Sequence, residues 1–299
     1  MNEDLLSELK RALLDRTPLE SLPQQVLEHQ AIINTWGTNS TEGNTLTLKE
    51  VQEVLIDGMG VKNRPIKDIM ETINHNEVFL GLTALSKKHV SLLTVLEFHE
   101  RVFKGVKPDA GQWRQSNVWI RGANFTPPRW EKVIPLMTEW LKEYAAEEKR
   151  RGDVFESAAW MHHRFETVHP FTDGNGRVGR LLLNLHFSKH NWPPVNVTPL
   201  NRNEYYAALN EGNDGDMSAL SESLRVLMGQ SIVDLLDQVG ATKEDGLRSI
   251  ADLGKNGPYS AKYLGLRAKH GSLPAVKRNG KWMTSKRALD LYVKHIGRS

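Results

Sequence analysis

The 299-residue sequence contains no cysteine, which excludes disulfide bridges and metal sites built on thiolates. It also has no apolar run close to the ~20 residues that a helix needs to cross a bilayer. The first eight residues, MNEDLLSE, are acidic and do not form the basic and apolar regions of a secretory signal peptide. From these absences we expect a cytoplasmic protein without a disulfide framework and without a membrane partner.

Charge is distributed unevenly along the chain, although the formal net charge is only +3. From Lys255 to the end there are eleven basic residues and one acidic residue, so this segment carries +10 and residues 1–254 carry −7. The hydrophobic content of 39% and the charged content of 25% are those of an ordinary globular protein. The asymmetry therefore predicts two parts of the chain with different partners.

Apolar residues recur at helical spacing over most of the chain, which predicts a mainly α-helical protein. Prolines and glycines interrupt this pattern at intervals and mark the connections. The expected helices cover residues 4–16, 23–36, 47–57, 65–86, 89–103, 130–149, 153–168, 178–188, 217–239 and 285–296.

Two segments depart from the helical pattern. Val118 and Ile120 alternate with other residue types ahead of a turn cluster at residues 122–124, which predicts a short strand. Near the C-terminus, Asn279 and Gly280 separate two short segments, and this pair is the strongest short signal for a β-hairpin.

Residues 169–180, HPFTDGNGRVGR, are the most informative stretch of the sequence. Pro170 ends one helix and a second helical run follows, so Gly174 and Gly176 lie at a helix N-terminus. The first turn of a helix has N–H groups without internal partners, and the helix dipole is positive there. The segment therefore predicts a site for a phosphate group.

The side chains of this segment suit a nucleotide. Arg177 and Arg180 can each bind phosphate oxygens through a planar guanidinium. Asp173 offers a hard oxygen ligand of the kind that Mg²⁺ prefers, and His169 can accept a proton near neutral pH. Together they suggest the attack of a hydroxyl on a nucleotide phosphate, whereas the simpler alternative is a capped helix with surface arginines.

The twelve residues resemble, without departure, the signature of the Fic family, His-Pro-Phe-x-Asp/Glu-Gly-Asn-Gly-Arg-x-x-Arg. The resemblance implies a Fic-type helical bundle that transfers AMP from ATP to a serine, threonine or tyrosine hydroxyl of a protein and releases pyrophosphate. By this resemblance His169 would be the general base, and Asp173 would hold Mg²⁺.

The resemblance also implies which residues surround the phosphates. Gly174, Asn175 and Gly176 would form an anion hole for the α- and β-phosphates. Arg177 would bind the β-phosphate, and Arg180 would bind the γ-phosphate.

Thr38, Glu42 and Gly43 resemble the inhibitory motif of class II members of this family, Ser/Thr-x-x-x-Glu-Gly/Asn, which also precedes the signature. Thr38 and Glu42 are four residues apart and would share one face of a helix. The resemblance implies that Glu42 pairs with Arg180, occupies the γ-phosphate position and holds ATP in an unproductive pose. A free Glu42 carboxylate could instead orient water, as in family members that remove AMP.

Two further regions follow from the same resemblance. Many Fic enzymes line the adenine pocket with a Tyr-Tyr pair and an Asn eight residues after its first Tyr, a spacing that Tyr205 and Asn213 have. The segment with Val118 and Ile120 would be a β-hairpin flap that adds the backbone of the target protein as an extra strand.

The basic C-terminal segment resembles an excisionase-like winged helix-turn-helix, a small α+β module, which implies a DNA-binding ancestry. We therefore predict an N-terminal helical region with the inhibitory motif (1–105), a Fic catalytic core (106–239) and a winged-helix module (247–299). The expected protein is an autoinhibited adenylyltransferase that uses ATP and Mg²⁺, acts on a protein, and forms a homodimer if it follows other family members. Two alternatives stay open: a hydrolase that removes AMP, and a DNA-binding regulator that senses nucleotide.

Overall fold

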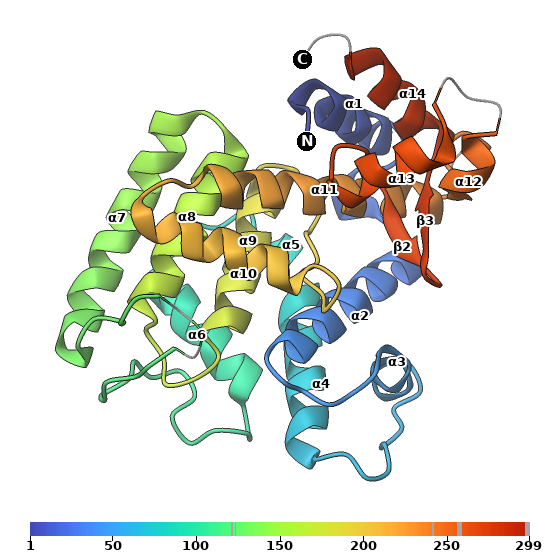
Figure 1. The fold of residues 1–299 in the computed structure, drawn as a ribbon. Helices are drawn as coiled ribbons and strands as arrows, with labels where there is room; N and C mark the ends of the chain where they lie inside the picture. Colours follow the sequence, from blue (N-terminus) through green and yellow to red (C-terminus); the bar gives the residue numbers. More distant parts are fainter. Residues whose placement is uncertain (121, 123, 241, 256–258, 297–299) are drawn as a thin grey trace. The chain divides into compact units, whose positions relative to one another are not determined.

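The computed structural model describes residues 1–120, 122, 124–240, 242–255 and 259–296. Helices make up 62% of it and strands 3%, so the predicted mainly α-helical fold is confirmed. The helices are labelled in Figure 1. Their bounds are α1 (Glu3–Leu14), α2 (Gln24–Thr41), α3 (Leu48–Leu55), α4 (Ile66–Leu80), α5 (Leu82–Leu85), α6 (Leu92–Phe103), α7 (Val133–Arg151), α8 (Val154–Val168), α9 (Asn175–Lys189), α10 (Arg202–Glu211), α11 (Ser218–Gln238), α12 (Ile250–Leu253), α13 (Ala261–Lys269) and α14 (Lys286–Ile296). The strands are β1 (Arg248–Ser249), β2 (Val276–Arg278) and β3 (Lys281–Thr284).

The chain forms two compact units, each assembled from segments that are far apart in the sequence. The first unit contains Met1–Leu27, Trp192–Val195 and Leu224–Ser299, and the second contains Glu28–Asn191 and Asn196–Ser223. These units are not consecutive stretches of the chain, so they do not test the predicted domains 1–105, 106–239 and 247–299, which stay a prediction. Within the described residues, no helix has both the length and the apolar character that crossing a membrane requires.

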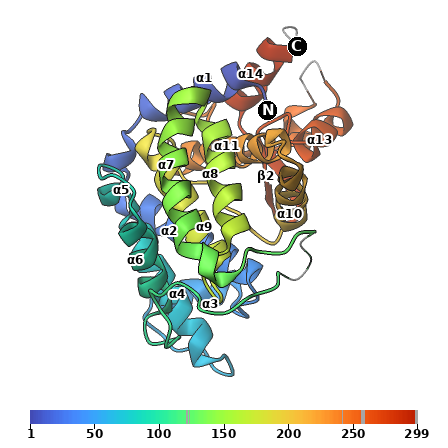
Figure 2. The ribbon, with the colours of Figure 1, turned by 90° about the vertical axis from the view of Figure 1, so that its left-hand side faces the viewer.

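The core of the second unit is built around α8, which lies beside α7 in both views (Figures 1 and 2) and packs against α9. Trp140 of α7 is fully buried, and its indole N–H donates to the carbonyl of Met161 on α8 at 3.0 Å. Phe98 and Phe103 bring α6 into the same core. Because α9 is covered on nearly all sides, the residues at its N-terminus are held in a fixed environment.

Local signals start the helices of this unit close to the predicted places. The Asp153 carboxylate caps α8 by accepting from the N–H groups of Phe155 and Glu156. A capping box begins α3, since Thr47 and Glu50 each satisfy a backbone N–H group of the other.

In the first unit, α1 packs against α14 (Figure 1). Glu8 of α1 accepts hydrogen bonds from Lys294 at 2.8 Å and lies 3.0 Å from Nε2 of His295. The apolar face of α1 is buried. Its buried residues are Leu5, Leu6, Leu9 and Leu13.

The same unit contains an antiparallel sheet with the strand order β1-β3-β2. Asn279 and Gly280 have φ angles of 50° and 77°, which a two-residue turn of type I′ requires, so the predicted hairpin is confirmed. Helix α13 precedes this hairpin and α14 follows it. The identity of this region as a winged helix-turn-helix stays a prediction.

The predicted flap hairpin is wrong as a secondary structure in the described part of residues 111–128, which contains no strand. Val118 and Ile120 are half-buried and Trp119 is exposed, so burial alternates along this segment as it would in a strand, although no other strand pairs with it. Side chains hold the segment instead of a ladder. The guanidinium of Arg114 donates to the carbonyl of Ser116, and the Asn117 side chain accepts from the N–H of Trp130. Two residues of the predicted turn region, at positions 121 and 123, lie outside the described residues.

Candidate active site

The loop between α8 and α9 consists of residues 169–174, and its first and last residues both have the left-handed backbone conformation, which few residues adopt. His169 ends α8 in the left-handed region with a φ of 50°, and its N–H still donates to the carbonyl of Phe165. Gly174 begins α9 with a φ of 84°, and a Cβ atom there would collide with the ring of Phe103. Glycine is therefore required at position 174 by both its conformation and its neighbour.

Asn175 holds this loop together with its side chain. Its carbonyl oxygen accepts from the N–H of Phe171 at 2.8 Å, and its amide donates to the Phe171 carbonyl at 2.9 Å. The side chain therefore faces the loop and not a ligand. No side chain caps the first turn of α9, which leaves its N–H groups directed at the space where an anion would bind.

His99 is a further support of the loop that its sequence spacing did not reveal. Its Nδ1 accepts from the N–H of Gly111 at 2.9 Å, so the proton is on Nε2, which lies 3.2 Å from the carbonyl oxygen of Asp173. The ring stacks on Phe171 with centroids 3.8 Å apart. Burial lowers the pKa of His99 to about 4, so this histidine is neutral at pH 7.

The imidazole of His169 is positioned to accept a proton. Its Nδ1 lies 3.2 Å from the carbonyl oxygen of Glu166, and its own carbonyl accepts from Arg114 at 2.8 Å. A proton on Nδ1 satisfies the Glu166 carbonyl and leaves Nε2 with a free lone pair. Burial lowers the pKa of His169 to about 4, so the ring is neutral at pH 7.

Asp173 lies at the rim of the loop, with a side chain that is 40% exposed. One carboxylate oxygen is 3.0 Å from Nζ of Lys107, and the other is 3.4 Å from the guanidinium of Arg177. Burial opposes ionisation of this group, but the charges of Arg177 and Lys107 outweigh it and lower the pKa of Asp173. The carboxylate is therefore available as an ionised oxygen ligand.

Arg177 has a partner that the sequence did not predict. It forms an ion pair with Glu71 of α4 at 2.9 Å, and the side chains of both residues are 4% exposed. Its guanidinium also lies over the ring of Phe103, 4.4 Å from the centroid. Glu71 is more than a hundred residues away in the sequence, and no spacing could have indicated this pair.

Arg180 is bound to the segment that resembles an inhibitory motif. Its Nε donates to the hydroxyl of Thr38 at 2.7 Å, and its guanidinium forms an ion pair with Glu42 at 2.6 Å. The predicted pairing of Glu42 with Arg180 is thus present. Helix α2 extends to Thr41, beyond the expected end at residue 36, and Gly43 follows it with a φ of 92°. Burial opposes the charge on Glu42, but Arg180 outweighs it and lowers the pKa of this carboxyl.

The approach of Glu42 to the anion site depends on Gly176. A Cβ atom at position 176 would overlap the Glu42 carboxylate, so only glycine leaves room for it. The carboxylate therefore lies against the first turn of α9, where a phosphate oxygen would otherwise be favoured.

Glu166 is a second acidic residue near this site, and no motif in the sequence indicates it. Its Oε1 atom is buried without a hydrogen-bond partner among the described residues. Burial raises the pKa of Glu166 to about 8, since the opposing influence of Arg180 is smaller. Glu166 is therefore protonated at neutral pH, whereas Glu42 is ionised.

The two residues predicted for an adenine pocket have different environments. Tyr205 is 1% exposed, and its hydroxyl is bonded to Nε2 of His162. Asn213 bonds to His163 at 3.0 Å and to Asn124. Only Asn213 borders a cavity of about 520 Å³ in this unit. Other residues that line the cavity are Phe125, Trp160, His163, Thr167 and Met217.

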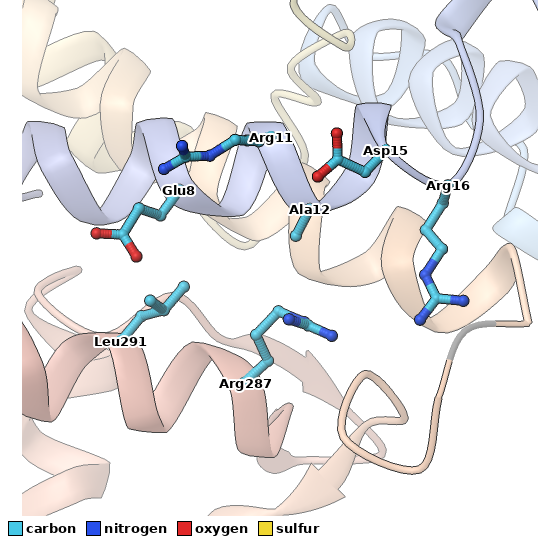
Figure 3. A pocket seen from close by; sticks show the side chains of 7 residues that line it. All are labelled: Glu8, Arg11, Ala12, Asp15, Arg16, Arg287 and Leu291. Carbon is cyan, nitrogen blue, oxygen red and sulfur yellow. The ribbon is translucent and has the colours of Figure 1, made fainter.

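A separate pocket of about 340 Å³ lies in the first unit (Figure 3). Its lining is mainly charged and includes Arg11, Arg16 and Arg287. Two of these arginines are already engaged by the buried Asp245, from which Arg16 is 3.5 Å away and to which Arg287 donates a hydrogen bond. None of the residues 169–180 lines this pocket, so we do not assign the chemistry of the loop to it.

Comparison with protein families matches residues 89–187 to the model described as Fic/DOC family. The chain is 34% identical over 228 residues to the protein adenylyltransferase fic-1 of Caenorhabditis briggsae, which covers 74% of this chain and 43% of that protein. It is 29% identical to the protein adenylyltransferase Fic of Nematostella vectensis, covering 73% of this chain and 52% of that protein. The chain thus spans about half the length of these curated relatives.

Solved structures also resemble this chain. Fic-1 of C. elegans (residues 134–508) has a TM-score of 0.66 at 28% identity, covering 79% of this chain and 73% of that one. A Fic domain containing signaling protein from Bacteroides thetaiotaomicron has a TM-score of 0.72 and covers 80% of this chain and 99% of that one. Its identity of 19% shows a shared fold alone.

Proposed function

The chain contains a Fic/DOC family domain, and from this premise we propose that it is a protein adenylyltransferase, which transfers AMP from ATP to a hydroxyl group of a protein. The observation that carries the proposal is the position of His169. This residue ends α8 in the left-handed conformation, and the short loop that follows it ends at the uncapped first turn of α9. A neutral base and an anion site then belong to one short loop. The names of the relatives that match most of this chain support the same activity.

The proposed reaction needs one proton acceptor. The oxygen of the target hydroxyl forms a bond to the α-phosphorus of ATP, and the bond between this phosphorus and the oxygen that bridges to the β-phosphate breaks. The hydroxyl proton passes to Nε2 of His169, and pyrophosphate leaves. The hydrogen bond from Nδ1 to the Glu166 carbonyl keeps the ring in the required tautomer.

Asp173 is our candidate for holding Mg²⁺ that arrives with the nucleotide. Magnesium is usually bound by one or two carboxylates together with phosphate oxygens, and Asp173 offers one ionised, partly exposed carboxylate beside the anion site. The ion would neutralise negative charge on the phosphates. Lys107 would have to move away from the carboxylate to admit it.

We propose that the Thr38–Glu42 segment inhibits transfer. Arg180 is the candidate ligand of the γ-phosphate, and its Nε and Nη2 atoms are engaged by Thr38 and Glu42. Productive binding of ATP requires this guanidinium to exchange the Glu42 carboxylate for phosphate oxygens. Removal of the carboxylate should therefore increase activity.

The test is incubation of the full chain with ATP and Mg²⁺, followed by mass spectrometry of the intact protein. We expect Glu42→Gly to add the mass of one or more AMP groups to itself, while the wild type adds little. The combined variant Glu42→Gly, His169→Ala should bind nucleotide without any mass gain. Equal or lower labelling of Glu42→Gly would contradict the inhibitory role, and labelling that survives the loss of His169 would contradict the proposed base.

A hydrolase that removes AMP is the second candidate, because the Glu42 carboxylate is ionised beside the anion site and could orient a water molecule. Incubation of a pre-modified target with the wild type and with Glu42→Gly separates the two activities. Loss of AMP only with the wild type would favour hydrolysis.

We further propose that α13 and the β2–β3 hairpin bind DNA. Several basic residues of this region are already neutralised, for example Arg278 by Asp234. Within the described residues, the exposed lysines of α13 and of the hairpin have no acidic partner. These lysines are Lys262, Lys269, Lys277 and Lys281.

DNA binding can be tested by fluorescence anisotropy of a labelled duplex with the full chain. Affinity should fall steeply as salt increases. The double variant Lys277→Ala, Lys281→Ala should bind more weakly than Lys286→Ala, whose lysine is paired with Asp290. Absence of binding at low salt, or equal binding by both variants, would contradict the proposal.

A further inference from the structure

Glu148, His186 and His190 form a cluster that the proposed reaction does not use. His186 lies in the last turn of α9, and His190 is the C-cap residue that follows this helix. Glu148 approaches them from the last part of α7. One ligand atom from each of the three side chains lies within 4.8 Å of the other two.

The separations fit a small metal ion with nitrogen and oxygen ligands. Oε1 of Glu148 lies 3.0 Å from Nε2 of His190 and 3.6 Å from Nδ1 of His186. In a tetrahedral zinc site, bonds of about 2.0 to 2.2 Å place neighbouring ligand atoms roughly 3.3 to 3.6 Å apart. Small side-chain rotations would bring all three atoms to these distances.

The second nitrogen of His186 has the partner that a metal-binding histidine needs. Its Nε2 lies 3.0 Å from the carbonyl oxygen of Val154, which fixes the proton on Nε2 and leaves the lone pair on Nδ1. Nδ1, which carries the lone pair, lies 3.6 Å from Oε1 of Glu148, and the Tyr144 hydroxyl is nearer to it. The ring of His186 is buried, whereas His190 and Glu148 are partly exposed and provide a route for an ion from solvent.

Two other polar groups share this space. The Tyr144 hydroxyl lies 2.7 Å from Nδ1 of His186 and 3.1 Å from Oε1 of Glu148, so it would either move or become a further ligand when an ion binds. Lys189 places its Nζ 3.4 Å from Glu148, but its long side chain can turn to solvent. Neither group closes the site.

We propose that Glu148, His186 and His190 bind one zinc ion, with a water molecule or the Tyr144 hydroxyl completing four-coordination. Two imidazoles and one carboxylate are a ligand set that suits Zn²⁺ and Co²⁺ better than Mg²⁺, which prefers oxygen. The ion would join α7 to α9 at the end of α9 opposite the loop that carries His169. The site is thus independent of the proposed transfer of AMP.

The competing interpretation is a hydrogen-bonded cluster in which the Glu148 carboxylate joins the two helices without an ion. The two interpretations differ in their response to zinc. In the first, zinc raises the melting temperature and binds with a stoichiometry of one. In the second, zinc has no specific effect, and each variant lowers the melting temperature by the same amount with or without zinc.

The experiment uses the full chain without an affinity tag, freed of metal with a chelator and then dialysed. Calorimetric titration with ZnCl₂ and visible absorption with Co²⁺ should each show one ion per chain, with the intense cobalt bands of a four-coordinate site. His190→Gln and Glu148→Gln should each weaken zinc binding by at least about tenfold, the lower range seen when the surroundings of a metal ligand are altered. His89→Gln, which changes an exposed histidine elsewhere, should bind zinc as the wild type does.

Zinc bound by the Asp173 carboxylate would also be counted in these titrations, and the variant Asp173→Ala removes this second site. This variant should retain the single zinc ion if the proposal holds. Absence of binding to the wild type, or binding that survives both His190→Gln and Glu148→Gln, would overturn the proposal. Because no readout depends on AMP transfer, failure here would not count against the proposed function.

Discussion

At the scale of single residues, Gly174 connects the sequence most directly to the site. Its φ of 84° belongs to the left-handed region, and an added Cβ atom would meet the ring of Phe103. Gly215 has a similar φ of 91° but no heavy atom within 4 Å of the position of its missing Cβ atom. A substitution at position 215 therefore costs only the free energy of the left-handed conformation, whereas one at position 174 also costs the free energy of the collision with Phe103.

We expect Gly174→Ala to destabilise the protein more than Gly215→Ala does. Placing alanine in the left-handed region should cost about 1 kcal/mol at either position. At position 174, displacement of Phe103 should add roughly 1 to 3 kcal/mol, as overpacking does in other cores. Urea unfolding of both variants measures the difference, and equal losses would show that the Phe103 ring adapts freely.

The buried pair of Arg177 and Glu71 allows a second test at this scale. Glu71→Gln removes the negative charge that faces the Arg177 guanidinium, whose side chain is 4% exposed. The positive charge of Arg177 is then left with only the longer contact to Asp173, so we expect the free energy of unfolding to fall by about 3 kcal/mol. If Arg177 binds a phosphate of ATP, the nucleotide should replace part of the missing charge. ATP with Mg²⁺ should then raise the melting temperature of Glu71→Gln more than that of the wild type.

The control for this test is Glu50→Gln, which removes a more exposed ion pair with Arg64 away from the loop. ATP should stabilise Glu50→Gln and the wild type equally. An equal effect of ATP on Glu71→Gln and the wild type would contradict the assignment of Arg177 to phosphate binding.

At the scale of elements, the caps give the most direct link from sequence to structure. Thr47 accepts from the N–H of Glu50, and the Glu50 carboxylate accepts from the N–H of Thr47 at 2.8 Å. Thr47→Ala should therefore cost about 1 kcal/mol, the usual loss for an N-cap residue. Thr138→Ala is the matched control, because this exposed threonine lies inside α7 and bonds only to the Ile134 carbonyl one turn earlier.

The expected change for Thr138→Ala is close to zero or slightly stabilising, since alanine has the higher helix propensity. Denaturant unfolding of the two variants under the same conditions gives the comparison. If both threonines proved equally important, the capping box would not be the reason why α3 begins at Leu48.

The elements also show where prediction from sequence stops. Periodicity predicted most of the longer helices but not α10, and the Asn279–Gly280 pair predicted a hairpin that is present, because these signals are local. The flap strand failed because pairing depends on a partner strand that a local alternation cannot specify, and the Arg114 side chain supplies hydrogen bonds in its place.

At the scale of the whole molecule, some contacts of the site follow from a sequence motif, whereas others depend on distant parts of the chain. The sequence predicted the contact of Arg180 with Glu42 through a motif, although 138 residues separate them. It did not predict Glu71, Glu166 or His99, since their roles arise from burial and from packing between distant helices. Such contacts have no spacing of their own and require the assembled fold.

Stability against acid is a property of the whole molecule that follows from its buried histidines. Burial, with the nearby charges of Arg180 and Arg177, lowers the pKa of His75 to about 3. Burial, with Arg180 and His163, also lowers the pKa of His162 to about 3. The unfolded chain takes up these protons near pH 6.5 but the folded protein does not, so the free energy of unfolding falls as the pH decreases below 6.5.

Glu166 acts in the opposite direction, because its pKa is raised to about 8 in the folded protein. Between about pH 4.5 and pH 8 the folded protein keeps this proton, whereas the unfolded chain has released it. Between pH 7 and pH 5, the two histidines should together remove roughly 4 kcal/mol, while Glu166 should add roughly 2 to 3 kcal/mol. Urea unfolding at both pH values should therefore show a loss that is larger in Glu166→Gln than in the wild type. The loss should be smaller in His75→Gln, which takes up one proton fewer. If Glu166→Gln lost no more stability than the wild type over this range, the buried carboxyl would not be protonated in the folded protein, and the charge balance of the site around Arg180 would have to be revised.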